Sequence, residues 1–192
     1  MLAIVLGYLA GSVPFAFLLA RRRGVDVRVA GSGNVGAANV MRTTGAGRGA
    51  AVMALDMAKG AAAVLAAQLS AGDVALAALA GAAAIVGHIY PVWLRFHGGK
   101  GVAVAAGVFS VLTPLGTVIA ASLFVITVSL TRYVSLGSIA ATVALPPAAW
   151  WSGAPPPVVI AAAATAALIL FRHRANLARL RAGTERRIGA RA

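Results

Sequence analysis

Residues 2–23 read LAIVLGYLAGSVPFAFLLARRR, an apolar block from Leu2 to Ala20 that ends in an arginine cluster. An α-helix rises about 1.5 Å per residue, so roughly 20 apolar residues cross the hydrocarbon core of a bilayer. The block has no basic residue ahead of it and three arginines behind it, the reverse of the charge order in a cleavable signal peptide. We therefore expect a retained membrane span whose N-terminus lies outside.

The rest of the chain repeats this pattern. Further apolar blocks occur at Ala51–Ser70, Val74–Leu94, Val102–Leu112, Leu115–Leu130, Val134–Trp151 and Pro156–Phe171. The fourth of the seven, Val102–Leu112, is shorter than the hydrocarbon core, so it is either a half helix or continuous with the fifth. With 60% apolar and 11% charged residues, the sequence predicts an all-α, polytopic membrane bundle formed by a single domain over residues 1–192.

The basic residues favour seven separate segments. If all seven cross, the loops after the first, third and fifth and the C-terminal tail share one side, and they contain nearly all the lysines and arginines. The remaining loops contain neither residue. Because positively charged loops stay in the cytoplasm, we expect cytoplasmic loops at about 21–50 and 95–101 and a cytoplasmic tail at about 172–192.

Composition also excludes some functions. The chain has no cysteine, which rules out a disulfide framework and cysteine-based catalysis. We explain its net charge of +13 by membrane topology and anionic lipid rather than by nucleic acid. No metal site or cofactor is expected.

The first cytoplasmic loop is rich in glycine and polar residues. Gly31, Gly33 and Gly36 match G-x-G-x-x-G, and Asp56 follows twenty residues later, as in a dinucleotide-binding fingerprint. The context does not fit, because no alternating strand and helix pattern follows. The chemistry still suits an anion: glycines let backbone amides approach a phosphate or carboxylate, and the side chains of Ser32, Asn34, Asn39 and Arg42 add donors. A tight loop that caps the next helix is the alternative.

A second glycine cluster follows the third block. Gly98-Gly99-Lys100-Gly101 opens a helix on the same predicted face, and amides at a helix start together with a lysine form an anion site. It is not a Walker A motif, because Gly101 stands where a magnesium-binding hydroxyl is required. His88 is interpreted as a packing residue, and Tyr90 and Trp93 as interfacial anchors.

Two further groups of polar residues accompany these loops. Asp56 and Lys59 are three residues apart, so they share a helix face and either form a structural pair or offer Lys59 to a substrate. In the basic tail, His173 and Asn176 have the same spacing and present uncharged polar groups that lipid contact alone does not explain.

Together these segments resemble the acyl-phosphate-dependent glycerol-3-phosphate acyltransferases of bacterial membranes. The resemblance rests on five ordered motifs: Gly11-Ser12-Val13-Pro14, Asp26 to Arg42, Leu55 to Gly60, Gly87 to Gly101 and His173 to Glu185. It implies a seven-helix enzyme of the bacterial cytoplasmic (inner) membrane, with its active site at the cytoplasmic face. Such an enzyme transfers an acyl group from acyl phosphate to the first hydroxyl of glycerol 3-phosphate and releases lysophosphatidic acid and phosphate.

The resemblance also assigns roles to residues. Catalytic roles fall to Ser32, Arg42, Lys100, His173 and Asn176, and structural roles to Asp56 and Glu185. Substrate contacts are expected from Gly31, Gly33, Asn34, Asn39, Lys59, Gly98, Gly99 and Gly101. Two positions depart from the family pattern: His97 replaces a lysine, and Ala38 replaces a threonine.

Other functions remain open from the sequence. The chain could be a membrane transporter of small anions or a non-catalytic protein that binds anionic lipid. The residues do not identify the general base, for which His173, Ser32 and a phosphate oxygen of the acceptor are candidates. Neither the preferred acyl chain length nor the oligomeric state can be inferred.

Overall fold

The computed structural model describes residues 1–189, and every regular element in that range is a helix. The predicted tail therefore extends three residues beyond the described part of the chain, to residue 192. The chain forms two compact units, Met1–Leu112 and the residues from Thr113 onward. Because residues 1–189 contain no strand, they form no dinucleotide-binding α/β domain, as the sequence context of the glycine motif indicates.

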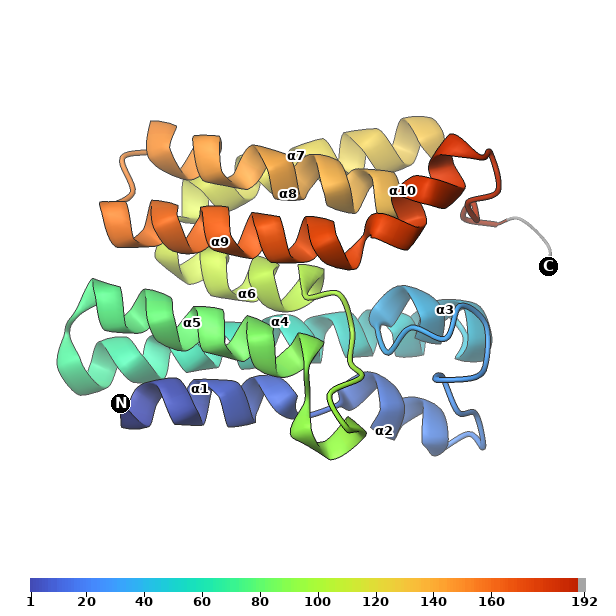
Figure 1. Ribbon diagram of the computed structural model, residues 1–192, viewed down its shortest axis with the longest axis horizontal. Coiled ribbons are helices and arrows are strands. Elements are labelled where there is room, and N and C mark those ends of the chain that lie inside the picture. Colours follow the sequence, from blue (N-terminus) through green and yellow to red (C-terminus); the bar gives the residue numbers. More distant parts are fainter. Residues whose placement is uncertain (190–192) are drawn as a thin grey trace. The chain divides into compact units, whose positions relative to one another are not determined.

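The first unit contains six α-helices and one short 3₁₀ helix in its described sequence (Figure 1). These are α1 (Leu2–Ser12), α2 (Phe15–Arg21), α3 (Ala37–Thr44), α4 (Ala46–Ala71), α5 (Val74–Ile89), η1 (Val92–Leu94) and α6 (Val102–Leu112). Helix α1 packs against α4 and α5, and α4 packs against α6.

Small residues allow these helices to approach closely. A Cβ added to Gly11 would collide with the backbone of Ala84 in α5, and one added to Gly107 in α6 would collide with the backbone of Met57 in α4. Such contacts stabilise helices in lipid, where burial of apolar surface contributes little to association.

A break interrupts the first span. Helix α1 ends at Ser12, and α2 starts at Phe15. Pro14 lies between them and has no backbone N–H for a helical hydrogen bond. The two helices together still form one apolar segment, Leu2–Arg21, long enough to cross a membrane. The break turns backbone carbonyls of the first span toward other helices.

The second unit contains α7 (Pro114–Thr131), α8 (Val134–Trp151), α9 (Pro156–Arg172) and α10 (Arg174–Arg181) among its described residues. Helix α8 packs against both α7 and α9 (Figure 1). The hydroxyls of Thr113 and Ser152 lie 3.0 Å apart and connect the start of α7 to the end of α8. The chain bends by 56° between α9 and α10, so the tail leaves the direction of the last long helix.

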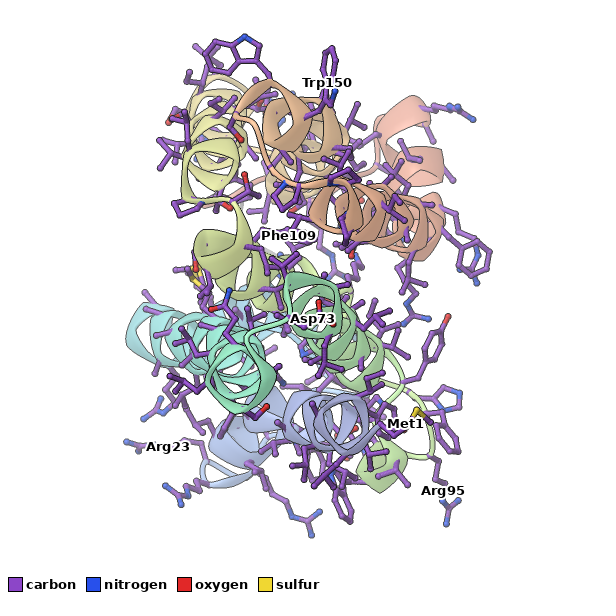
Figure 2. The ribbon with its side chains drawn as sticks, turned by 90° about the vertical axis from the view of Figure 1, so that its left-hand side faces the viewer. Met1, Arg23, Asp73, Arg95, Phe109 and Trp150 are labelled. Carbon is purple, nitrogen blue, oxygen red and sulfur yellow. The ribbon has the colours of Figure 1, made fainter. Side chains whose placement is uncertain are left out.

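All seven predicted blocks are helical, which confirms the membrane-bundle fold. Within residues 1–189, five segments are long and apolar enough to span a bilayer, or six if α9 and α10 count as one bent span. Helix α6 has only 11 residues. How many segments cross, and in which orientation, stays a prediction. Figure 2 shows Arg23 and Arg95 pointing outward from the first unit, as expected for residues that meet water or lipid headgroups.

Candidate functional site

The glycine-rich loop between α2 and α3 begins with a surface ion pair. Arg28 donates from Nη2 to Asp26 Oδ2 at 2.6 Å, and its guanidinium also lies 4.8 Å from the centre of the Phe17 ring. The hydrogen bonds from the Arg28 side chain and backbone lower the pKa of Asp26 to about 2. These contacts attach the start of the loop to α2 through the side chains of Arg28 and Phe17.

Asn39 holds the loop in place from behind. Its Nδ2 donates to the carbonyls of Val27 and Ala30, each at 3.0 Å, and its Oδ1 accepts from the Ser32 amide at 2.9 Å. Gly31 has a φ of +63°, and a Cβ there would collide with Asn39 Oδ1. Glycine is thus required both by the backbone conformation and by the space.

Asn39 is fully buried, with an exposed fraction of 0%. The sequence places it among the substrate contacts, but a side chain without exposed surface cannot touch a substrate in this conformation. Because its amide is occupied by backbone groups, Asn39 shapes the loop instead. The amide of Ser32 also bonds to Asn39, so it is not available to an anion in this conformation.

The loop brings Ser32 and Arg42 together. Arg42 lies on α3, and its Nη2 donates to Ser32 Oγ at 3.2 Å. Both residues are predicted to be catalytic, and both are exposed at the surface. A hydroxyl beside a guanidinium suits recognition of a phosphate oxygen, because the planar guanidinium binds such oxygens through two parallel hydrogen bonds.

The second glycine cluster folds back onto the end of α5. The amides of Gly98 and Gly99 donate to the carbonyls of Ile89 and His88, both at 3.1 Å. These amides are therefore not available to an anion. Lys100 and Gly101 follow directly, and α6 begins at Val102, so the predicted binding of an anion at this turn would rest on the ammonium group and the start of α6.

The turn also lies against the first glycine loop. A Cβ on residue 99 would stand 2.7 Å from the carbonyl oxygen of Val35, which belongs to the loop. The two glycine clusters, separated by about sixty residues in the sequence, are thus neighbours within the first unit. This juxtaposition was not deducible from the spacing of the motifs alone.

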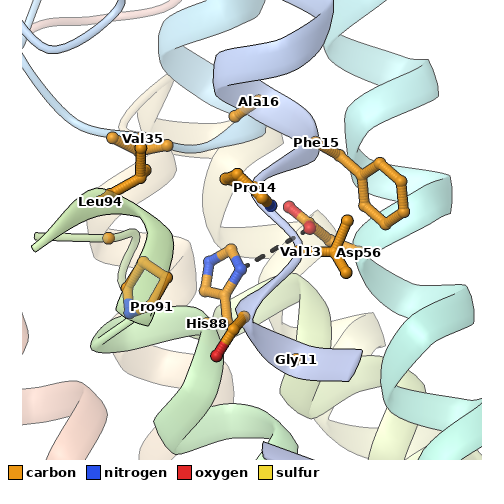
Figure 3. Close-up of a pocket in the computed structure, with 12 residues that line it drawn as sticks. Gly11, Val13, Pro14, Phe15, Ala16, Val35, Asp56, His88, Pro91 and Leu94 are labelled. Carbon is orange, nitrogen blue, oxygen red and sulfur yellow. Dashed lines mark ion pairs between the residues drawn. The ribbon is translucent and has the colours of Figure 1, made fainter. Parts of the chain in front are cut away.

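Behind the turn lies a buried polar cluster of Asp56, Lys59 and His88, of which Figure 3 shows Asp56 and His88. Lys59 Nζ is 2.7 Å from Asp56 Oδ1, 2.8 Å from the Val13 carbonyl oxygen and 3.1 Å from His88 Nδ1. The Asp56 carboxylate is also 3.6 Å from His88 Nδ1. Of the two alternatives for Asp56 and Lys59, the structure shows the ion pair, and Lys59, with an exposed fraction of 7%, is held away from the surface.

Sequence reasoning missed two members of this cluster. His88 is not merely a packing residue, because its ring contacts both charged groups. The Val13 carbonyl is accessible to Lys59 because the first span breaks at Pro14. The available signal was the proline inside an otherwise continuous apolar block, which frees carbonyls for partners elsewhere. A small cavity of about 10 Å³, lined partly by Pro14, Asp56 and His88, borders the cluster.

The predicted residues of the tail form a separate cluster in the second unit. Asn176 Nδ2 donates to Glu185 Oε1 at 2.7 Å, and Arg179 Nε donates to Oε2 at 2.7 Å. Burial raises the pKa of Glu185, but these hydrogen bonds outweigh that effect and leave its pKa below the usual value. His173 is buried, and its Nδ1 lies 2.8 Å from the Ile169 carbonyl oxygen.

The structure thus joins Ser32 with Arg42, and the loop with the Gly98–Gly101 turn, within the first unit. It joins Asn176 with Glu185 in the second. A convergence of both clusters on one substrate remains a prediction, as do the individual roles of these residues.

Comparison with known proteins identifies the family. Residues 1–183 match the family model described as glycerol-3-phosphate acyltransferase. The glycerol-3-phosphate acyltransferase of Myxococcus xanthus is 46% identical, over 96% of this chain and 97% of that relative. That of Rubrobacter xylanophilus is 47% identical, over 99% of this chain and 96% of the relative.

Solved structures agree with this assignment. The fold matches the crystal structure of PlsY, an integral membrane glycerol 3-phosphate acyltransferase, in its glycerol 3-phosphate form, with a TM-score of 0.94 and 40% identity. The match covers 98% of this chain and 94% of the other. The lysophosphatidic acid form of PlsY matches with a TM-score of 0.92. The chain therefore belongs to the glycerol-3-phosphate acyltransferase family and is an integral membrane enzyme with that activity.

Proposed function

We propose that this enzyme uses acyl phosphate as its acyl donor and transfers the acyl group to the first hydroxyl of glycerol 3-phosphate, at the cytoplasmic face of the bacterial inner membrane. The observation that supports this most is the pair formed by Ser32 and Arg42 in a loop that packs against the glycine-lysine turn. Each of these two segments carries a cationic side chain, Arg42 on α3 and Lys100 in the turn, which suits a reaction in which both substrates carry phosphate.

The donor needs no covalent enzyme intermediate. An acyl phosphate is a mixed anhydride, so its carbonyl carbon is already activated and phosphate is a good leaving group. The acceptor oxygen attacks the acyl carbon, the bond between that carbon and the phosphate oxygen breaks, and the hydroxyl proton passes to a base. Holding both substrates in the reactive orientation is then the main task of the enzyme.

Within this scheme Arg42 and Lys100 bind phosphate oxygens and stabilise the charge that develops as phosphate leaves. The Ser32 hydroxyl donates to a phosphate or to the oxyanion of the tetrahedral intermediate. Gly98 and Gly99 shape the turn, since their amides are bonded to α5.

His173 has the tautomer that a general base requires. Its Nδ1 faces the carbonyl oxygen of Ile169, which only accepts hydrogen bonds, so Nδ1 carries the proton and Nε2 the lone pair. The hydrogen bond between Asn176 and Glu185 holds α10, which begins directly after this histidine. Ser32 and a phosphate oxygen of the acceptor remain alternative bases.

The choice of donor can be tested directly. Purified protein in detergent is given radiolabelled glycerol 3-phosphate with palmitoyl phosphate, palmitoyl-coenzyme A or palmitoyl-acyl carrier protein. We expect labelled lysophosphatidic acid with palmitoyl phosphate only. Product formation from a thioester but not from the acyl phosphate would overturn the proposed donor while leaving the acyltransferase activity intact.

A further inference from the structure

We propose that His88 is a positioning residue for the Gly98–Gly101 turn, and that Lys59, itself paired with Asp56, holds its ring in one tautomer. The inference rests on the proposed phosphate-binding role of that turn. Nothing in the reaction scheme uses the cluster of Asp56, Lys59 and His88, although three buried ionisable side chains are costly to place in a membrane protein.

The contacts of Lys59 define the tautomer of His88. An ammonium group has three hydrogens and accepts nothing. The three neighbours of Lys59 Nζ are Asp56 Oδ1, the Val13 carbonyl oxygen and His88 Nδ1, at 2.7, 2.8 and 3.1 Å. Because Nδ1 must accept, the ring proton of neutral His88 lies on Nε2.

The other edge of the ring faces the turn. His88 Nε2 occupies the place that a Cβ on residue 99 would need, so the ring and the turn are in direct contact. The backbone of His88 reinforces the contact, because its carbonyl accepts from the Gly99 amide at 3.1 Å. One residue thus supports Gly99 from its side chain and its main chain.

Lys100 is the next residue in the chain, so its placement depends on the Gly98–Gly99 backbone. The position of its backbone, and that of the start of α6, depends on where Gly98 and Gly99 rest on the end of α5. A ring fixed by buried charges is a rigid support, since rotation about its χ angles would break the contact with Lys59. We infer that the buried cluster fixes the position of His88, and that His88 in turn fixes the backbone that carries the phosphate-binding groups.

Kinetics of three His88 variants test this role. His88→Ala removes both edges of the ring. His88→Asn keeps an oxygen near the position of Nδ1, and His88→Gln places an amide nitrogen near the position of Nε2. Ser12→Ala is the matched control: Ser12 lines the same cavity, but its hydroxyl donates to the Tyr8 carbonyl within α1.

We expect the Michaelis constant for at least one phosphate substrate to rise about tenfold or more in His88→Ala, the usual effect of losing one well-placed interaction. The turnover number should change less. His88→Gln should recover most of the affinity, and His88→Asn little of it. Unchanged kinetic constants in a folded His88→Ala, or a fall in turnover number alone, would overturn the positioning role.

A second readout is independent of the acyl donor. Inorganic phosphate, the proposed product, should raise the thermal unfolding temperature of the wild type in detergent and raise it much less in His88→Ala. Failure of palmitoyl phosphate as donor would leave this measurement valid. No stabilisation of the wild type by phosphate, or an equal stabilisation of both proteins, would refute the inference.

Gly99→Ala probes the contact itself. The added methyl group collides with His88 Nε2 in the wild type, so it should reduce phosphate affinity. In the His88→Ala background the same substitution should cost less, because that collision is gone. Strictly additive losses would contradict a direct contact between the ring and the turn.

Discussion

Replacement of Asn39 by alanine tests the claim that a buried amide orders the loop that carries Ser32. The substitution removes two hydrogen bonds to the Val27 and Ala30 carbonyls and one from the Ser32 amide. At about 1 kcal/mol each, their loss amounts to about 3 kcal/mol, or roughly a hundredfold in the equilibrium between the ordered and displaced loop. We therefore expect the ratio kcat/KM for glycerol 3-phosphate to fall by one to two orders of magnitude.

The assay compares Asn39→Ala with Thr43→Val in detergent at matched concentrations of folded protein. Thr43 lies one turn further along α3, and its hydroxyl donates to the Asn39 carbonyl at 2.8 Å. The control thus removes a hydrogen bond from the same helix and leaves the amide of Asn39 in place. We expect it to retain most of its activity. If folded Asn39→Ala keeps kcat/KM within about threefold of the wild type, the loop does not depend on this residue and the reasoning is wrong.

Three further predictions concern stability. Glu185→Gln should lower the thermal unfolding temperature at pH 7. The pKa of Glu185 in the folded protein is below its unfolded value near 4.5. The carboxylate therefore stabilises the fold above pH 4.5, and this stabilisation is lost as the pH falls through the folded-state pKa. A melting-temperature difference from the wild type that fails to shrink in acid would contradict this. Gly11→Ala should destabilise the packing of α1 on α5. Gly47 lies in a helix, and a Cβ added there meets no neighbour, so Gly47→Ala should be neutral or stabilise the protein by up to about 1 kcal/mol. Equal melting temperatures of the two variants would refute the close-packing argument. Lys59→Ala should destabilise strongly, by about 3–5 kcal/mol, because it leaves a buried charge unpaired. The double variant Asp56→Ala with Lys59→Ala should be more stable than Lys59→Ala alone. A lower resistance of the double variant to denaturation would show that the two residues are not coupled.

The helical membrane fold could be predicted because lipid restricts the possible structures of an apolar chain. The apolar blocks are helical, and Pro114 and Pro156 stand at helix starts, where their missing N–H groups cost nothing. The pairing of Asp56 with Lys59 also followed from helical spacing alone. The separation of the fourth and fifth blocks is confirmed, since α6 ends at Leu112 and α7 begins at Pro114.

Other features depend on tertiary contacts that spacing does not reveal. The first span was predicted as one helix, but Pro14 divides it and frees the Val13 carbonyl for Lys59. The sequence predicts that the loop between α2 and α3 supplies hydrogen-bond donors to an anion, but the side-chain amide of Asn39 donates to backbone carbonyls instead. His88 was assigned to packing because a single histidine in an apolar helix carries no signal of its partners.

The measurement that tests the central claim most directly is the stoichiometry of the reaction in detergent. Wild-type protein given palmitoyl phosphate and glycerol 3-phosphate should release one phosphate for each lysophosphatidic acid formed, and neither product when glycerol 3-phosphate is omitted. Folded Arg42→Ala and Lys100→Ala should both lose this coupled release. Phosphate release without the acceptor, or wild-type turnover in both variants, would contradict acyl transfer at the site formed by the glycine loop and the glycine-lysine turn.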